Sequence, residues 1–254
     1  MQRFKGKVVI VTGAGSGIGQ ATAQRFSDEG ATVVLAGRTL AKLDKAAASL
    51  PKTRTLVCVT DVSRYEEVEA LVATTIDAFG ALHVLVSNAG IAPEGDVVTG
   101  KVSASEEVMA VNAGGVFHCA RAALPHLVKS KGCIVNTASV SGLGGDWGLA
   151  FYNASKGAIV NLTRSMAMDH GKNGVRVNSV CPSLTLTPMT DDIKNDKKAL
   201  AKFAERIPLG RPAEPSGIAA AIAFLASDDA SFITGVNLPV DGGVTASNGQ
   251  PAMG

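Results

Sequence analysis

Three residues near the middle of the chain could together move a proton. Tyr152 and Lys156 are four positions apart, a spacing that places both side chains on one face of a helix. Ser139 directly follows the apolar stretch 132–138, which we expect to be a strand. A free phenol titrates near pH ~10 and is a poor base, but a neighbouring ammonium lowers its pKa. We therefore expect Tyr152 to exchange a proton with a substrate oxygen that Ser139 also binds.

A glycine-rich segment, TGAGSGIG at residues 12–19, follows the first apolar run and precedes a helical pattern. Glycine allows a tight turn and lets the backbone approach a phosphate, and a helix N-terminus offers free N–H groups to it. In this strand–turn–helix context the segment indicates a dinucleotide site; the alternative is a turn without a ligand. The residues expected at the pyrophosphate are Gly13, Gly15, Ser16, Gly17, Ile18 and Gly19.

The second apolar run indicates which dinucleotide binds. NAD sites normally carry an Asp or Glu about 20 residues after the glycines, but no acidic residue occurs between Gly30 and Leu43. The run ends in Gly37 and Arg38, and a guanidinium can bind a 2′-phosphate in fork geometry. We expect NADP as the cofactor, with NAD as the alternative if Arg38 is only a solvated surface charge.

The elements that position these residues alternate regularly along the chain. Apolar, β-branched runs predict strands at 7–12, 32–37, 54–59, 83–87, 132–138, 174–180 and 236–239. Helical patterns lie near 17–29, 40–49, 64–79, 104–128, 150–171 and 215–226. Continuously apolar strands are typical of a parallel sheet covered on both faces. We expect an α/β fold, a doubly wound parallel sheet with helices on both faces, as one domain over 1–254.

Two stretches depart from this alternation. Residues 182–214 combine four prolines with many charges, which is typical of a lid or substrate loop. The tail 244–254 is small and polar, and we expect it to reach a neighbouring subunit. Since residues 140–145 carry no charge, a small neutral alcohol or ketone is a plausible substrate. The expected pocket residues are Ser139, Ser141, Trp147, Tyr152 and Leu184.

Composition excludes several other functions. The chain has 254 residues and a net charge of +2, which argues against nucleic acid or an anionic membrane as a partner. Its apolar runs are too short for a signal peptide or a membrane span, and four scattered cysteines suit a reduced, cytoplasmic protein. The four histidines lack metal-ligand spacing, so no metal is expected.

Taken together, these motifs resemble the short-chain dehydrogenase/reductase family, whose Rossmann domains interconvert alcohols and ketones with NAD(P). The glycine segment, the SNAG sequence at 87–90 and the later PSLTLT sequence at 182–187 follow the family's pattern in order. The resemblance adds Asn112 to Ser139, Tyr152 and Lys156 as a fourth catalytic residue. It implies a homotetramer, and cofactor contacts from Asp61, Val62, Asn88, Ala89, Gly90, Tyr152, Lys156, Pro182, Thr185 and Thr187.

Within the family, two segments are similar to bacterial 2,3-butanediol dehydrogenases, which act as acetoin and diacetyl reductases. These segments are residues 136–147 and the C-terminal residues 241–250. The resemblance implies a diol, acetoin or diacetyl as substrate. Two alternatives stay open: a family member that acts on a larger sugar, steroid or acyl substrate, and a redox-inactive nucleotide sensor or scaffold on the same fold.

Overall fold

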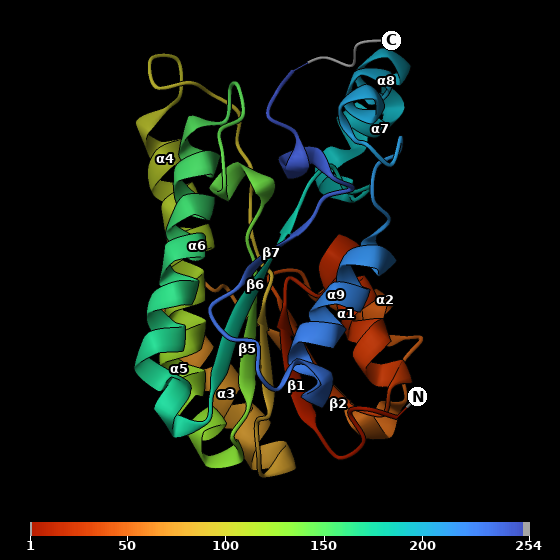
Figure 1. The fold of residues 1–254 in the computed structure, drawn as a ribbon. Helices are drawn as coiled ribbons and strands as arrows, with labels where there is room; N and C mark the ends of the chain where they lie inside the picture. The colour runs from red at the N-terminus through yellow and green to blue at the C-terminus, as the bar shows by residue number, and fades with distance from the viewer. Residues whose placement is uncertain (1, 251–254) are drawn as a thin grey trace.

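The computed structural model describes residues 2–250, and in it seven parallel strands form one sheet. The strand order is β3-β2-β1-β4-β5-β6-β7, and Figure 1 shows helices packed on both sides of the sheet. The strands are β1 (Val8–Thr12), β2 (Thr32–Gly37), β3 (Thr55–Val59), β4 (Val84–Ser87), β5 (Cys133–Thr137), β6 (Arg176–Pro182) and β7 (Asn237–Val240). The order reverses between β1 and β4, where doubly wound sheets open a crevice at the carboxyl ends of the strands.

Two apolar cores explain why the strands are continuously hydrophobic. Ile10 points into the core under α3, α5 and α6, whereas Val9 and Val11 point into the core under α1, α2 and α9. Because the central strands β1, β4, β5 and β6 are buried on both faces, both sets of alternate positions are mostly apolar there. The edge strands β3 and β7 are only partly buried. The covering helices are α1 (Gly17–Asp28), α2 (Leu40–Ala47), α3 (Tyr65–Phe79), α5 (Gly115–Ser130), α6 (Ala150–His170) and α9 (Pro215–Ala226).

The helix expected at 104–128 is a composite. It starts as α4 (Val102–Val108), widens into a π-helical turn over Met109–Gly114, and continues as α5. Inside the turn, the side chain of Asn112 accepts a hydrogen bond from Ile91 N and donates one to Ile91 O, both at 2.9 Å. This contact holds the Asn112 side chain against the segment after β4 at the point where the helix widens.

The stretch 182–214 is more regular than the sequence suggested. It contains α7 (Asp191–Asn195) and α8 (Lys197–Arg206), two helices that the sequence analysis did not predict within the expected lid or substrate loop. The side chain of Asp196 caps α8 by accepting from Lys198 N and Ala199 N. No residue of α8 is buried, although Leu200, Phe203 and Ala204 give the helix one apolar side.

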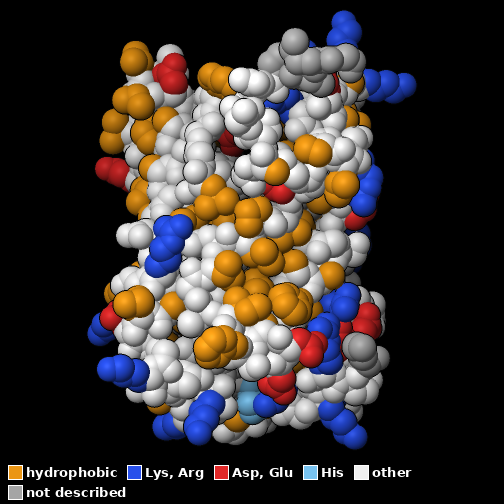
Figure 2. All heavy atoms as spheres, in the orientation of Figure 1, with side chains coloured by type: hydrophobic (Ala, Val, Ile, Leu, Met, Phe, Trp, Pro, Cys, Tyr) orange, Lys and Arg blue, Asp and Glu red, His pale blue; other side chains and the backbone are white. Residues whose placement is uncertain are grey.

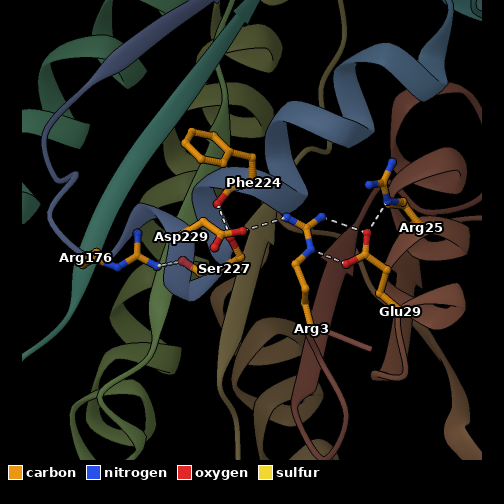
Figure 3. Close-up of polar contacts among 7 residues, drawn as sticks. All are labelled: Arg3, Arg25, Glu29, Arg176, Phe224, Ser227 and Asp229. Carbon is orange, nitrogen blue, oxygen red and sulfur yellow. Dashed lines mark hydrogen bonds and ion pairs between the residues drawn. The ribbon is translucent and has the colours of Figure 1, made fainter. Parts of the chain in front are cut away.

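At the amino ends of the strands, charged side chains tie the N-terminal segment to α1 and α9 (Figure 3). Arg3 Nη2 lies 2.8 Å from Glu29 Oε1, and Arg3 Nη1 lies 3.5 Å from Asp229 Oδ2. Arg25 also pairs with Glu29. These contacts hold the N-terminal segment against the amino ends of the strands, opposite the crevice.

The surface carries few contiguous apolar areas on the face drawn in Figure 2, and one crosses β7 and α9 in the middle of that face. Phe224 of α9 is 37% exposed, and Phe232, just before β7, is fully exposed. Among residues 2–250, no helix combines the length and the apolar character that crossing a bilayer requires.

Candidate active site

The glycine turn lies at the carboxyl end of β1 and leads into α1. Gly13 has a φ of +66°, and a Cβ there would lie 2.9 Å from Ala89 Cα. A Cβ on Gly19 would lie 2.2 Å from Gly13 O, so neither position tolerates a side chain. α1 begins with no side-chain cap and no acidic residue in its first turn. Its free N–H groups and positive end therefore face the crevice without competition for an anion.

Hydrogen bonds from the segment after β4 fix this turn against the sheet. Thr12 Oγ1 accepts from Asn88 N at 2.9 Å and from Ala89 N at 3.1 Å. Asn88 Nδ2 donates to Thr12 O at 3.0 Å. The two strands on either side of the topological switch are thereby held together at their carboxyl ends, and the floor of the crevice is rigid.

Two cavities form this crevice, and both are lined by Gly13, Ala89 and Gly90. The larger, of about 270 Å³, is lined by most of the predicted site residues: Ser16, Gly17, Ile18, Asn88, Ser139, Tyr152, Lys156, Pro182, Leu184, Thr185 and Thr187. The smaller, of about 130 Å³, is lined by Arg38, Asp61 and Val62. One continuous site thus joins the glycine turn to both groups, as an extended dinucleotide requires.

Five predicted residues do not line either cavity. Gly15 and Gly19 belong to the glycine turn but do not line the cavities. Ser141 does not line them either and is hydrogen-bonded with Ser139. Asn112 is fully buried and also donates to Ser155 Oγ at 2.9 Å. Trp147 is 99% exposed, so the structure does not place it in the wall of the pocket.

Lys156 is a buried cation beside the phenol. Its side chain is only 4% exposed, and its Nζ donates to Thr137 O at 2.8 Å and lies 5.5 Å from the centre of the Tyr152 ring. Burial lowers the pKa of Lys156 to about 8, because removing water disfavours the ammonium. The lysine therefore changes charge close to neutral pH.

The pKa of Tyr152 differs from the sequence expectation. Burial raises it above the usual value for a phenol, a hydrogen bond with Ser139 lowers it, and the charge of Asp146 raises it further. The Lys156 ammonium does not reverse this in the protein alone, since burial also penalises the lysine charge. A phenolate at this position needs an additional positive charge nearby.

Ser139 lines the larger cavity and is held there by hydrogen bonds with Ser141. It is 7% exposed, its Oγ accepts from Ser141 N at 3.1 Å, and it lies 3.0 Å from Ser141 Oγ. Together Ser139 and Tyr152 present two hydroxyls to one point of the larger cavity. That arrangement can bind and protonate a carbonyl oxygen, or bind and deprotonate an alcohol.

At the other end of the crevice, Arg38 is exposed and lies beside Gly37 and Asp61. Burial raises the pKa of Asp61, but hydrogen bonds from Ser63 and the charges of Arg38 and Arg64 outweigh it, and the net shift is downward. The ionised Asp61 and the Arg38 guanidinium offer one acceptor and one fork of donors to the adenosine part of a nucleotide.

Two of the residues that sequence reasoning missed contact the reacting groups or their neighbours. Thr137 supplies the carbonyl that holds Lys156, and Asp146 accepts a hydrogen bond from Ser141 Oγ. The first is a backbone contact that any residue type could make, so no sequence signal marks it. The second depends on how the loop after β5 folds. Within the described part of the chain, no group of three or more His, Cys, Asp or Glu side chains could hold a metal ion.

Comparisons with known proteins agree with this geometry. A family model described as enoyl-(acyl carrier protein) reductase matches residues 13–245. The meso-2,3-butanediol dehydrogenase of Serratia marcescens is 56% identical over 251 residues, which is 99% of both chains. The glucose 1-dehydrogenase of Gluconobacter oxydans is 41% identical and aligns with 96% of this chain and 93% of its own. The crystal structure of levodione reductase superposes with a TM-score of 0.92 at 35% identity, over 96% of this chain and 100% of that one.

Proposed function

The chain belongs to the short-chain dehydrogenase/reductase family, and from this premise we propose that it interconverts a small secondary alcohol and its ketone. It is an NAD(P)-dependent oxidoreductase that acts on CH–OH groups. The observation that supports the finer proposal is the meeting of Tyr152, Ser139 and Lys156 in the cavity that starts at the glycine turn.

The residues of this chain act on the substrate oxygen. Ser139 donates a hydrogen bond to that oxygen and fixes its position. Tyr152 delivers a proton to it during reduction and takes the proton back during oxidation. Lys156, held by Thr137 O, stabilises the phenolate with its charge. The bound nicotinamide supplies the hydride in reduction and accepts it in oxidation, and its oxidised ring adds the second positive charge.

The proposal is tested by the substitution Tyr152→Phe, which removes one oxygen and little else. We expect NADPH consumption with diacetyl, or with another small ketone, to fall about 10²–10⁴-fold because the general acid is lost. The control is cofactor affinity, which should change little. Equal rates for the variant and the wild type would end the proposal. No turnover by the wild type with any alcohol or ketone would favour the redox-inactive sensor instead.

We propose NADP as the preferred cofactor. Arg38 is exposed at the smaller cavity, and Gly37 beside it provides no carboxylate to repel a 2′-phosphate. A Cβ at Gly37 would lie 3.4 Å from Leu43 Cδ2, an ordinary contact. Packing against a Cβ therefore does not force the absence of a side chain at Gly37.

Titrations with NADPH and NADH test this preference. We expect Arg38→Ala to weaken NADPH about 10–100-fold, which corresponds to about 1.5–3 kcal/mol for a charge-assisted hydrogen bond, and to leave NADH nearly unchanged. Gly37→Asp should weaken NADPH in the same way and strengthen NADH through the ribose hydroxyl. Equal losses for both nucleotides in Arg38→Ala would contradict the assignment.

A small diol or hydroxyketone is the substrate class that we propose. The relative with 56% identity is named for meso-2,3-butanediol. The larger cavity, of about 270 Å³, must also hold the nicotinamide, which leaves room for only a few substrate atoms. Leu184 lines it at 9% exposure and gives an apolar contact for a methyl group.

We also propose that the chain forms a homotetramer through α5 and α6. Phe117 of α5 is 49% exposed and Met168 of α6 is 83% exposed, and apolar side chains on the outer faces of long helices favour association. The proposed reach of the tail 244–254 to a neighbouring subunit concerns residues that partly lie outside the described range, which ends at Gln250.

A further inference from the structure

A series of hydrogen bonds leads from the wall of the active-site cavity to the surface. Tyr152 and Ser139 line the same cavity, and hydrogen bonding with Ser139 lowers the pKa of Tyr152. Ser139 Oγ lies 3.0 Å from Ser141 Oγ, and Ser141 Oγ donates to Asp146 Oδ2. Ser139 and Ser141 are 7% and 5% exposed, whereas Asp146 is exposed to solvent. The series therefore begins at the reacting groups, crosses a buried pair of hydroxyls and ends at a carboxylate in water.

The carboxylate gives this series one direction. An ionised Asp146 can only accept, so Ser141 must donate to it. The lone pairs of Ser141 then accept the proton of Ser139, and a lone pair of Ser139 is left for the proton of Tyr152. Once Ser139 Oγ no longer donates to a substrate oxygen, every hydroxyl proton in the series can point toward Asp146 at the same time. Proton transfer along hydroxyls needs this arrangement.

The loop that carries Asp146 is anchored to the helix that carries Tyr152. Asn153, the residue after Tyr152, donates from Nδ2 to the backbone oxygen of Asp146 at 2.9 Å. Ser141 lies in a short 3-10 turn over Val140–Gly142, and Ser139 Oγ accepts from Ser141 N at its start. All members of the series are thus fixed relative to one another by backbone contacts.

We propose that Ser141 and Asp146 carry the Tyr152 proton to solvent during alcohol oxidation, a proposal that rests on the proposed function. First, the alcohol O–H bond breaks and the phenol O–H bond forms. Next, the phenol O–H bond breaks as Ser139 takes this proton, the original proton of Ser139 passes to Ser141, and that of Ser141 passes to the Asp146 carboxylate. Finally, the Asp146 acid releases its proton to water. One proton leaves, and no group in the series is oxidised or reduced.

Asp146→Asn is the decisive variant, because an amide oxygen still accepts from Ser141 but cannot take the proton. Rapid mixing of enzyme, oxidised cofactor and alcohol in weak buffer allows two signals to be followed. They are the absorbance of the reduced cofactor and the colour of a pH indicator that reports released protons. We expect both signals to rise together in the wild type, and proton release to lag tenfold or more in Asp146→Asn. The matched control, Asp77→Asn on the exposed surface of α3, should behave as wild type.

Further variants separate proton transfer from positioning. Ser141→Ala removes the middle of the series and should give the same lag, and the double variant should add nothing to it. Asp146→Glu should restore synchronous release. If proton release stays synchronous in both Asp146→Asn and Ser141→Ala, the proton leaves by another path, such as Lys156, and the proposal is overturned. A slow Asp146→Ala beside a normal Asp146→Asn would show positioning only and would also overturn it.

A readout without cofactor or turnover keeps this test independent of the proposed function. The chain has two tyrosines, so the Tyr65→Phe background leaves Tyr152 as the sole phenol for an absorbance titration. The charged groups set against its ring are Lys156 on α6 and Asp146 on the preceding loop. Adding Asp146→Asn should lower the pKa of Tyr152, since the negative charge that opposes phenolate is gone. An unchanged titration would show that Asp146 is not connected to Tyr152.

Discussion

The two ends of the sheet differ in how their buried charged side chains are paired. At the amino end, Arg3 and Arg25 pair with Glu29, and Arg176 donates to backbone carbonyls (Figure 3). At the carboxyl end, Lys156 is buried beside a phenol and a carbonyl oxygen, and forms no ion pair within residues 2–250. The cavity at the amino end measures about 480 Å³, and the cavity that contains Tyr152 and Lys156 measures about 270 Å³. The state of the charges, rather than the size of the cavity, distinguishes the reactive end.

This difference appears in the pKa values. Arg3 and Arg25 hold the pKa of Glu29 at about 2, well below its usual value of 4.5. Burial lowers the pKa of Lys156 from 10.5 to about 8. The first shift means that the folded chain favours the charged carboxylate. The second means that the folded chain disfavours the charged lysine. Paired charges therefore stabilise the fold at the amino end. At the carboxyl end, the buried charge of Lys156 lowers stability and is available for the reaction.

Lys156→Met gives the largest expected effect. We expect alcohol oxidation to fall about 10²–10⁴-fold, because the phenolate loses its charge partner. The free energy of unfolding near pH 7 should rise by about 1 kcal/mol, since a buried charge is replaced by an apolar side chain of similar length, less the lost bond to Thr137 O. Steady-state rates and urea unfolding measure the two effects. A variant that is both inactive and clearly less stable would contradict the comparison, because it would show that Lys156 stabilises the fold.

Glu29→Gln tests the opposite end. We expect a loss of about 3 kcal/mol in the free energy of unfolding at pH 7, because Arg3 loses its buried partner, with turnover kept at temperatures where the variant is folded. The contribution of Glu29 is present above its unfolded pKa of 4.5 and is lost as the pH falls toward about 2. Urea unfolding at several pH values should show the two proteins converging in acid. A constant difference down to pH 2 would refute the assigned pairing.

Arg176→Met gives the smallest effect. The guanidinium donates to Leu225 O at 2.7 Å and to Ser227 O at 3.1 Å, and these carbonyls close the end of α9. Removing the donors should cost about 1–2 kcal/mol of unfolding free energy and leave the rate at the carboxyl end unchanged. Thermal unfolding together with a rate measurement checks both. A changed turnover rate would mean that the two ends are coupled rather than separate.

The sequence predicts the sheet well because burial on both faces leaves little freedom. Each observed strand begins and ends within two residues of its expected range. The π-helical turn at 109–114 and the helix α8 were not predicted. In the first, Asn112 binds Ile91, a contact that no periodicity reveals. α8 does carry an apolar side at Leu200, Phe203 and Ala204, and this signal could have predicted it.

The site likewise contains residues that the sequence predicts and residues whose positions depend on tertiary contacts. Gly13, Ser139 and Tyr152 meet as expected because carboxyl ends of parallel strands converge at one crevice. The position of Asp146 depends on a short turn and on the amide of Asn153, which no periodicity encodes. The upward shift in the pKa of Tyr152 likewise depends on burial, which spacing along a helix does not reveal.

The widened turn between α4 and α5 fixes the length of the chain at that point. An α-helix advances about 100° per residue, and a π-helical turn holds one residue more than a regular one. Deleting any single codon from 109–114 would leave a continuous helix, yet it would rotate everything on one side of the cut by that angle. The amide of Asn112 would then swing away from Ile91. A new side chain at the exposed positions Met109 or Ala110 leaves this register intact, whereas a change in the number of residues does not.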